Sequence, residues 1–274
     1  MADQYLKYVF PINAHTHIGD AFISLPEKKF SVEELVAPPH GYKYKMMAKA
    51  RREEIIDGMR KVIKKMERIG TYAFIDFREG GVEGIKMLKE AMNGNIKAII
   101  LGRPSKMEYD KDEVDKLLSI SHGIGLSSVS DWEYEEIEKI AEHVNKKNKI
   151  FALHVSEARH EDIDDVLKLK PNFIVHMCMA KKQDIEKVAE ENIPVVICPR
   201  ANSFFGLRPK VEILMEYGVK LMLGTDNAMI VEPNIIEEMN YLIKNFDVKK
   251  RDAIKMISEI PKNYFKKILK MVKE

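Results

Sequence analysis

Short apolar runs rich in β-branched residues alternate along the whole chain with longer charged segments whose apolar residues recur at helical spacing. Near-continuous apolar runs are typical of parallel strands that are covered on both faces. We count eight such runs, at residues 8–15, 71–77, 97–101, 123–129, 150–155, 172–177, 194–198 and 220–225. Eight strand–helix units within 274 residues predict an α/β fold, a (β/α)8 TIM barrel.

The segments between these runs predict the helices. We expect them at 44–69, from Gly80–Gly81 to Met92, after Asp110, up to Val144 with Ser130 or Asp131 as N-cap, at 162–169, 183–191 and 209–217, and twice within 233–274. The stretch from Asp20 to Tyr44 predicts no regular element and is long enough to be a lid. A packed or oligomer-forming segment is the other interpretation of this stretch.

No linker, internal repeat or low-complexity stretch divides the sequence, so we predict one domain over residues 1–274. A doubly wound sheet is the alternative, because strand order cannot be read from one sequence. That alternative usually carries a glycine-rich phosphate loop, and neither GxGxxG nor GxxxxGK[ST] follows any of the eight runs. The barrel is therefore the favoured architecture.

The charge balance favours neither nucleic acid nor an anionic membrane as a partner, although it leaves a local basic patch possible. Forty-five Lys and Arg against forty-three Asp and Glu leave a net charge of +2, which gives no general field for nucleic acid or an anionic membrane.

The apolar runs are far shorter than a bilayer span, and the first residues, MADQYLKYVF, do not resemble a signal peptide. Two cysteines make no disulfide framework. We expect a cytoplasmic protein that acts on a small molecule, with a homo-oligomer left open.

Polar residues end several of the predicted strands, where a barrel places its active site. His15 and His17 end the first, and their i, i+2 spacing aims both imidazoles the same way. His154 and His176 end the fifth and sixth, and Asp226 follows the eighth. Each alone is more often a packed histidine or a helix cap. Together, four of eight histidines and one carboxylate at strand ends predict a site for zinc or another divalent first-row metal.

This arrangement resembles the amidohydrolase superfamily, whose barrels carry HxH on strand 1, His on strands 5 and 6, and Asp on strand 8. The strings HVSEA (154–158), CPRAN (198–202) and GTDNA (224–228) are similar to motifs of its adenosine, cytosine and cyclic deaminase branches. Ala201 stands where those motifs have serine. The resemblance implies a metal-dependent hydrolase of C–N bonds. By the same resemblance, the metal ligands would be His15, His17, His154 and Asp226. The catalytic residues would be Glu157, His176 and Asp226.

The chemistry of that implied site can be stated for each residue. A bound metal with an open position generates hydroxide from water at neutral pH. Asp226 would accept the water proton, and Glu157 would protonate a ring nitrogen and then the leaving amine. His176 would donate to the tetrahedral centre. We therefore expect hydrolytic deamination of a cyclic or nucleoside-like amine.

We expect one divalent metal per chain. Zn²⁺ is the first expectation, and Fe²⁺ or Mn²⁺ are the alternatives. Binuclear members of the superfamily use a carboxylated Lys or a Glu on strand 3 or 4, and the runs ending Leu101-Gly102-Arg103 and 123–129 contain neither. The larger cyclic deaminases also carry a β-sandwich built from flanking residues. The residues before the first run and after the eighth predict none here.

Two other functions compete with a deaminase. TatD-type metal-dependent nucleases have a similar HxH and a GxIGL-like fourth segment, but they need a Glu where this chain has Gly123. A non-catalytic metal-binding barrel is the second alternative, and Glu157 argues against it because a structural site has no use for that carboxylate.

Substrate contacts are the least constrained part of the sequence. Arg103 and Arg200 follow the third and seventh runs and could hold a carboxylate or phosphate, as could Arg78 after the second. Pairing with local acidic residues at the rim is an equal alternative for each arginine. Asn202 could bind a heterocycle or cap the next helix. Arg103, Arg200 and Asn202 are the predicted substrate-binding residues.

Overall fold

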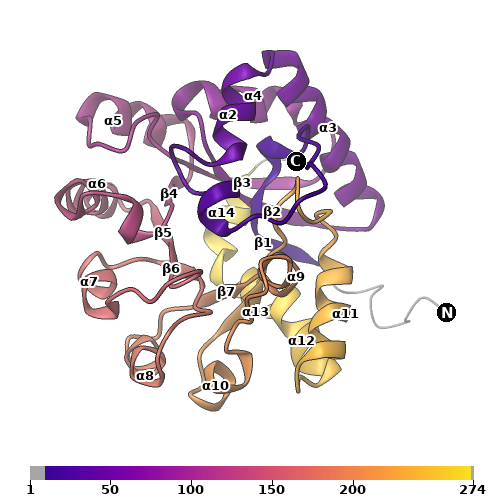
Figure 1. The fold of residues 1–274 in the computed structure, drawn as a ribbon, viewed down its shortest axis with the longest axis vertical. Helices are drawn as coiled ribbons and strands as arrows, with labels where there is room; N and C mark the ends of the chain where they lie inside the picture. The colour runs from indigo at the N-terminus through magenta and orange to yellow at the C-terminus, as the bar shows by residue number, and fades with distance from the viewer. Residues whose placement is uncertain (1–9, 273–274) are drawn as a thin grey trace.

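A computed structural model describes residues 10–272, and in that range the chain forms a curled parallel sheet with helices around it (Figure 1). The nine strands of this range are hydrogen-bonded in the order β8-β7-β6-β5-β4-β3-β2-β1-β9. They are β1 (Ile12–His17), β2 (Ala73–Arg78), β3 (Lys97–Gly102), β4 (Gly123–Leu126), β5 (Ile150–Val155), β6 (Phe173–His176), β7 (Val195–Ile197), β8 (Leu221–Leu223) and β9 (Asp226–Asn227). The parallel α/β architecture predicted from the alternation is confirmed.

The eighth predicted run differs from expectation because it is split. β8 pairs with β7, and β9 pairs with β1. The strand is interrupted between them at Gly224 and Thr225. Within the break, the Gly224 amide donates to the Ile197 carbonyl and the Thr225 amide donates to the His15 carbonyl. The two ends of the sheet order are thus joined through one short stretch of chain, and Asp226 is placed beside β1.

Other strand boundaries also shift. β1 extends through His17 instead of ending at His15, and the start predicted at residue 8 lies outside the described residues. β4 ends at Leu126, because Val129–Asp131 forms a 3-10 turn, η3. The prediction of Ser130 or Asp131 as a helix N-cap is therefore wrong, and the helix that follows has Glu133 at that position.

The helices follow the predicted alternation with additional breaks. They are α1 (Val32–Leu35), α2 (Tyr42–Lys49), α3 (Arg52–Arg68), α4 (Gly81–Ala91), α5 (Lys111–Ile120), α6 (Tyr134–Lys146), α7 (Ile163–Lys168), α8 (Lys182–Glu190), α9 (Pro199–Phe204), α10 (Val211–Glu216), α11 (Ile235–Asn245), α12 (Lys250–Ile257), α13 (Glu259–Tyr264) and α14 (Lys266–Met271). The single helix expected at 44–69 is two helices, because Ala50 and Arg51 are extended. The stretch 233–272 holds four helices instead of two, and α9 was not predicted.

Two apolar layers lie on the two faces of the sheet. The outer layer packs the helices against the sheet and includes Phe74, Ile100 and Leu153. The inner layer includes Ile75, Phe77 and many further residues that alternate with the outer ones along the strands. Phe265, between α13 and α14, and Leu269 of α14 join the inner layer. The same layer includes Ile12 and Phe173, which lie at the starts of their strands, so the amino ends of the strands are covered. The carboxyl ends of the strands are left for polar residues.

The segment between β1 and α3 is packed against the rest of the chain. It contains a 3-10 turn, η2 (Ile18–Asp20), then α1 and α2, so the prediction of no regular element from Asp20 to Tyr44 is wrong. Ile23, Phe30 and Leu35 form a buried cluster with Met229. None of the helices in residues 10–272 is both long enough and apolar enough to span a membrane.

Candidate metal centre

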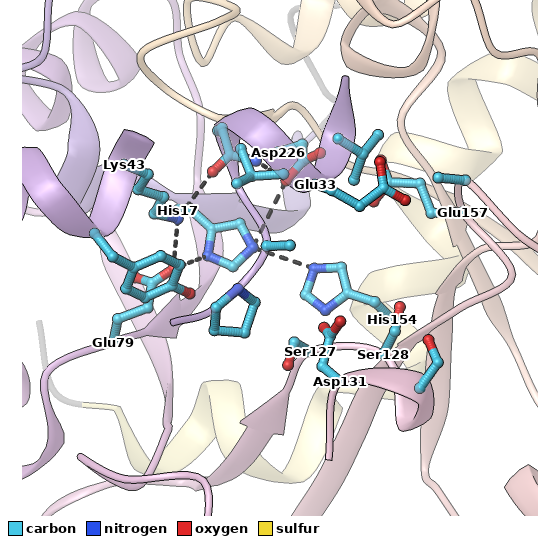
Figure 2. A pocket seen from close by; sticks show the side chains of 18 of the residues that line it. His17, Glu33, Lys43, Glu79, Ser127, Ser128, Asp131, His154, Glu157 and Asp226 are labelled. Atoms are coloured by element: carbon cyan, nitrogen blue, oxygen red, sulfur yellow. Dashed lines mark hydrogen bonds and ion pairs between the residues drawn. The ribbon is translucent and has the colours of Figure 1, made fainter. Parts of the chain in front are cut away.

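Three histidines and one aspartate from three strands, β1, β5 and β9, meet at the carboxyl end of the sheet. The Nε2 atom of His154 lies 3.2 Å from Nε2 of His15 and 3.2 Å from Nε2 of His17. Oδ1 of Asp226 lies 3.3 Å from Nε2 of His15 and 3.6 Å from Nε2 of His17. Figure 2 shows His17, His154 and Asp226 converging on one point. His176 is close as well, since one ligand atom from each of His15, His154, His176 and Asp226 lies within 4.8 Å of the others.

The donor set fits a first-row metal. Metal–nitrogen bonds of about 2.0–2.1 Å in a tetrahedral site place neighbouring ligand atoms roughly 3.3 Å apart, close to the distances above. Burial lowers the pKa of His15, His154 and His176 to about 3, and burial together with Lys43 holds the pKa of His17 well below its usual value. The imidazoles are therefore neutral at neutral pH and keep the lone pairs that a metal needs.

A β-bulge aims the first two histidines. Ile12 and Ala14 belong to the inner apolar layer, so strict alternation would turn His15 and His17 outward. The register between β1 and β2 shifts between Asn13 and Thr16, where β1 has one extra residue. His15 instead packs edge-on against the inner-layer ring of Phe77, with the centroids 4.4 Å apart.

Left-handed backbone conformations place two other members of the site. His176 has φ of 83° and Asp226 has φ of 65°, values that non-glycine residues seldom adopt. In β6 the inner residues are Phe173 and Val175, so regular alternation would send His176 to the outer face. The turn at His176 brings its imidazole to the cluster instead. Such conformations cost energy and gather at functional sites.

Hydrogen bonds at Nδ1 set the tautomers of His17 and His154, whereas Nδ1 of His15 has no hydrogen-bond partner among the described residues. In His17, Nδ1 lies 2.7 Å from Oε1 of Glu79 and 3.1 Å from the Phe77 carbonyl; in His154 it lies 2.7 Å from the Leu126 carbonyl. These partners only accept, so Nδ1 carries the proton and Nε2 keeps its lone pair.

His176 is held in the opposite way. Its Nδ1 lies 3.1 Å from the amide nitrogen Nδ2 of Asn202, which donates. Nδ1 therefore accepts, and in a neutral ring the proton is on Nε2.

The Asn202 amide also contacts the predicted acid–base residue. Nδ2 of Asn202 donates to Oε1 of Glu157 over 3.2 Å, and Oε2 of Glu157 lies 3.5 Å from Nε2 of His176. Burial, and then Asp226 and Asp131, raise the pKa of Glu157 well above its usual value. A carboxyl group with a raised pKa, placed beside the buried histidines and Asp226, is suited to donate a proton.

The predicted substrate residues have different surroundings. A pocket with about 600 Å³ of open volume leads to the cluster, and His17, His154, Glu157 and Asp226 line it, as does Arg103. Arg103 is buried and donates to the Tyr44 hydroxyl. Asn202 is fully buried in its contacts with Glu157 and His176.

The other two arginines are engaged by acidic groups. Arg200 of α9 turns to Glu237 and Glu238, with nitrogen–oxygen distances of 3.4 and 3.7 Å. Arg78 lies buried between Asp76, at 3.4 Å, and Glu79, at 2.6 Å. For both residues, pairing with local acids is the arrangement that the structure shows.

A buried polar network next to the cluster was not anticipated from the sequence. Nζ of Lys43 lies 2.5 Å from Oε1 of Glu79, 2.9 Å from Oδ1 of Asn227 and 3.4 Å from Oδ2 of Asp20. Burial opposes ionisation of Glu79, but Lys43, His17 and Arg78 outweigh it and hold its pKa well below the usual value. Glu79 follows the second strand, so the strand-end rule that selected the histidines could have found it. No local pattern distinguishes Lys43.

Comparisons with known proteins show the family to which the chain belongs. The model of the amidohydrolase family matches residues 11–267. An uncharacterized protein of Methanocaldococcus jannaschii is 37% identical over 267 residues, with 89% of this chain and 69% of that protein covered. A 5-methylthioadenosine/S-adenosylhomocysteine deaminase of Caldicellulosiruptor saccharolyticus is 28% identical over 269 residues, with 84% of this chain and 58% of that protein covered.

A solved structure shows the same fold. Guanine deaminase of C. acetobutylicum superposes with a TM-score of 0.75 at 15% identity, over 97% of this chain and 78% of that one. The chain thus spans between 58% and 78% of the length of these three proteins. From its match to the family model over nearly its whole length, the chain belongs to the amidohydrolase family.

Proposed function

We propose that this chain is a metal-dependent amidohydrolase that deaminates a cyclic or nucleoside-like amine by hydrolysis. Family membership and deaminases among the relatives support hydrolysis of C–N bonds. The observation that carries the proposal is the placement of Glu157, which Asn202 holds beside His176 and the ligand cluster at a position where burial raises the pKa of its carboxyl group. A site that only held a metal would not need a proton donor in that position.

His15, His17, His154 and Asp226 would hold one divalent metal, with zinc as the first expectation and Fe²⁺ or Mn²⁺ as alternatives. The Nδ1 hydrogen bonds support His17 and His154 as ligands, because both Nε2 atoms keep a lone pair. The same reasoning makes His176 a donor instead of a ligand. When bound, the metal would act as a Lewis acid that makes water nucleophilic at neutral pH.

The remaining steps belong to side chains of this chain. Asp226 would accept a proton from the attacking water, and Asn227 holds its Oδ1 by a 2.9 Å hydrogen bond. Nε2–H of His176 would donate to the attacking oxygen and so orient it toward the substrate carbon. Glu157 would protonate a ring nitrogen of the substrate, regain a proton from the hydroxyl group of the tetrahedral intermediate and pass it to the departing amine, so that the C–N bond breaks and ammonia leaves. The proton that Asp226 accepted from water would then return to Glu157.

Among the predicted substrate contacts, we retain Arg103, because it is buried and lines the pocket beside Tyr44. We assign Asn202 a positioning role, since its amide nitrogen is engaged by Glu157 and His176. We also infer that the sheet is a single-domain (β/α)8 barrel, in which the stretch 221–227 is one interrupted eighth strand that pairs on both sides.

Metal stoichiometry on purified protein, paired with an ammonia-release screen over purines, pyrimidines and their nucleosides, tests the proposal. We expect about one metal per chain and ammonia from at least one compound. Two tightly held metals together with hydrolysis of DNA would favour a nuclease. Bound metal with no release of ammonia from any compound in the screen would favour a non-catalytic barrel.

A further inference from the structure

Lys43 joins the segment over the pocket to two of the proposed metal ligands. We propose that Lys43 is a positioning residue that holds His17 and Asp226 in place, and that it thereby couples metal binding to the docking of residues 32–44 over the pocket. The inference rests on the metal site proposed above and is independent of the substrate and of the reaction.

The first connection runs through Glu79 to His17. Nζ of Lys43 and Nδ1 of His17 both contact the same atom, Oε1 of Glu79, at 2.5 and 2.7 Å. Figure 2 shows Glu79 between the two side chains. The carboxylate fixes the ring plane and the tautomer of His17, so Nε2 points at the cluster. Outer partners of this kind commonly orient metal ligands and tune their basicity.

The second connection runs through Asn227 to Asp226. Oδ1 of Asn227 accepts from Lys43 over 2.9 Å, and Nδ2 of the same amide donates to Oδ1 of Asp226 over 2.9 Å. The ammonium group can only donate, so it fixes which end of the amide faces Asp226. One lysine therefore orients ligands that come from β1 and β9.

Lys43 reaches these groups only while its own segment is docked. It lies in the first turn of α2, with 2% of its surface exposed. On one side, Tyr44 contacts Arg103. On the other, Val36, Ala37 and Pro38 line the pocket together with Glu33 of α1. If this segment moved away, Asp20 and Glu79 would lose the Lys43 ammonium group, and Glu79 would keep the guanidinium of Arg78 as its charged partner.

Coupling of this kind is reciprocal. A docked segment holds His17 and Asp226 in ligand geometry, so it favours metal binding. Metal binding fixes the same two residues and with them Glu79 and Asn227, so it must favour the docked segment by the same free energy. A buried ion pair with a merely structural role would stabilise the fold without responding to metal.

The experiment uses Zn²⁺ as the probe and compares two buried lysines. Lys43→Met removes the ammonium group at the site. Lys97→Met is the matched control, because Lys97 is also buried and its Nζ donates to the Leu269 carbonyl, over 3.2 Å, near the opposite end of the sheet. Zinc affinity is measured by competition with a chelator, and hydrogen exchange is measured for peptides covering residues 32–44 with and without zinc.

We expect Lys43→Met to bind zinc about 10- to 100-fold more weakly than the parent, and Lys97→Met to bind it about as tightly as the parent. Zinc should slow exchange in residues 32–44 of the parent and of Lys97→Met but leave it unchanged in Lys43→Met. Parent-like zinc affinity in Lys43→Met, or equal losses in both variants, would overturn the inference.

The unmodified protein provides a test that needs no variant to fold. If zinc leaves exchange in residues 32–44 of the parent unchanged, the coupling does not exist. Failure of the proposed function is distinguishable from failure of this inference. If zinc slows exchange in residues 32–44 but the protein releases no ammonia, only the proposed deaminase activity is wrong. If Lys43→Met binds zinc as tightly as the parent, only the inference about Lys43 is wrong.

Discussion

The amide nitrogen of Asn202 lies 3.1 Å from Nδ1 of His176, and this contact determines what the histidine can do. A donor at Nδ1 leaves the proton of the neutral ring on Nε2, the nitrogen that lies 3.5 Å from Oε2 of Glu157. Since Asn202 also donates to Glu157, one buried amide orients both proposed proton donors. We infer that Asn202 acts through these residues instead of touching the substrate.

Replacing Asn202 by aspartate tests that relationship. In Asn202→Asp a carboxylate faces Nδ1 and accepts, so the proton of His176 moves to Nδ1 and Nε2 can no longer donate. We expect kcat to fall by about 100-fold or more while metal content is unchanged. Steady-state ammonia release and metal analysis provide the measurement.

Asn145→Asp is the control for the change of charge, because Asn145 donates to the Leu169 carbonyl away from the site. It should keep parent-like kcat. Full activity in Asn202→Asp would show that the tautomer of His176 does not matter for turnover.

The metal ligands can be separated from the donor by comparing two histidines. We predict that His17→Asn loses most of its bound metal, because it removes a lone pair that points into the cluster. His176→Asn should keep its metal and lose turnover, since His176 Nε2 carries a proton in our assignment. Metal analysis after gel filtration decides between them, and loss of metal from His176→Asn would make His176 a ligand and our tautomer assignment wrong.

Glu157→Gln removes the proton donor while preserving the size of the side chain. We expect retained metal, parent-like folding and a loss of about 100- to 10,000-fold in kcat, the usual contribution of general acid–base catalysis. Metal content and ammonia release are measured on the same preparation. If the variant turns over at the parent rate, Glu157 does not shuttle the proton, and the proposed function loses the observation that carries it.

The site follows from the sequence as far as regular strands determine it. Parallel strands bring their carboxyl ends together, so His154, which lies near the end of a regular strand, could be placed without knowing strand order. In β3, the inner residues Ile99 and Leu101 put Arg103 on the same face by simple alternation. These residues needed only the position of each strand and a period of two.

The positions of the other site residues depend on irregular backbone conformations, which the secondary-structure propensities of the residues do not predict. The bulge in β1 and the left-handed φ of His176 are fixed by tertiary neighbours, and no local residue pattern announces them. Lys43 enters the network from a segment far along the chain from Glu79 and Asn227, so its role exists only in the folded protein. The split of the helix predicted at 44–69 could not be predicted from local residues either, because neither Ala50 nor Arg51 is a helix breaker.

Close packing at Gly224 supports the position of His15. A Cβ atom at Gly224 would lie 2.6 Å from Cβ of His15 and 2.9 Å from its backbone nitrogen. The chain in β1 cannot move aside easily, so Gly224→Ala should destabilise the fold by about 1–3 kcal/mol. We also expect it to weaken zinc binding, although it changes no ligand.

Gly206→Ala separates packing from backbone strain. Gly206 has φ of 73°, and apart from Gly206 itself and its two chain neighbours no atom of the described residues lies within 4 Å of the position that a Cβ atom would take there. Alanine at this position should therefore cost stability through its backbone conformation alone, without affecting the metal site. Denaturant unfolding and zinc competition are measured on both variants. Parent-like zinc affinity in Gly224→Ala would show that the close approach does not control His15.

Glu238 should make stability depend on pH. Burial raises its pKa to about 8, although it accepts a 2.8 Å hydrogen bond from the backbone amide of Arg200. In the unfolded chain the carboxyl ionises near its ordinary pKa of 4.5. The folded state is therefore penalised progressively as pH rises from about 5 to about 8, where the unfolded chain is already ionised and the folded chain is not.

Glu238→Gln keeps an oxygen for the Arg200 amide and cannot ionise, so it removes that penalty. We expect the variant to match or fall slightly below the parent in stability near pH 5 and to exceed it near pH 8, by on the order of 1 kcal/mol or more. Urea unfolding at a series of pH values gives the difference directly. A difference that is flat between these pH values would mean that Glu238 is ionised in the folded protein, held by the nearby guanidinium of Arg200.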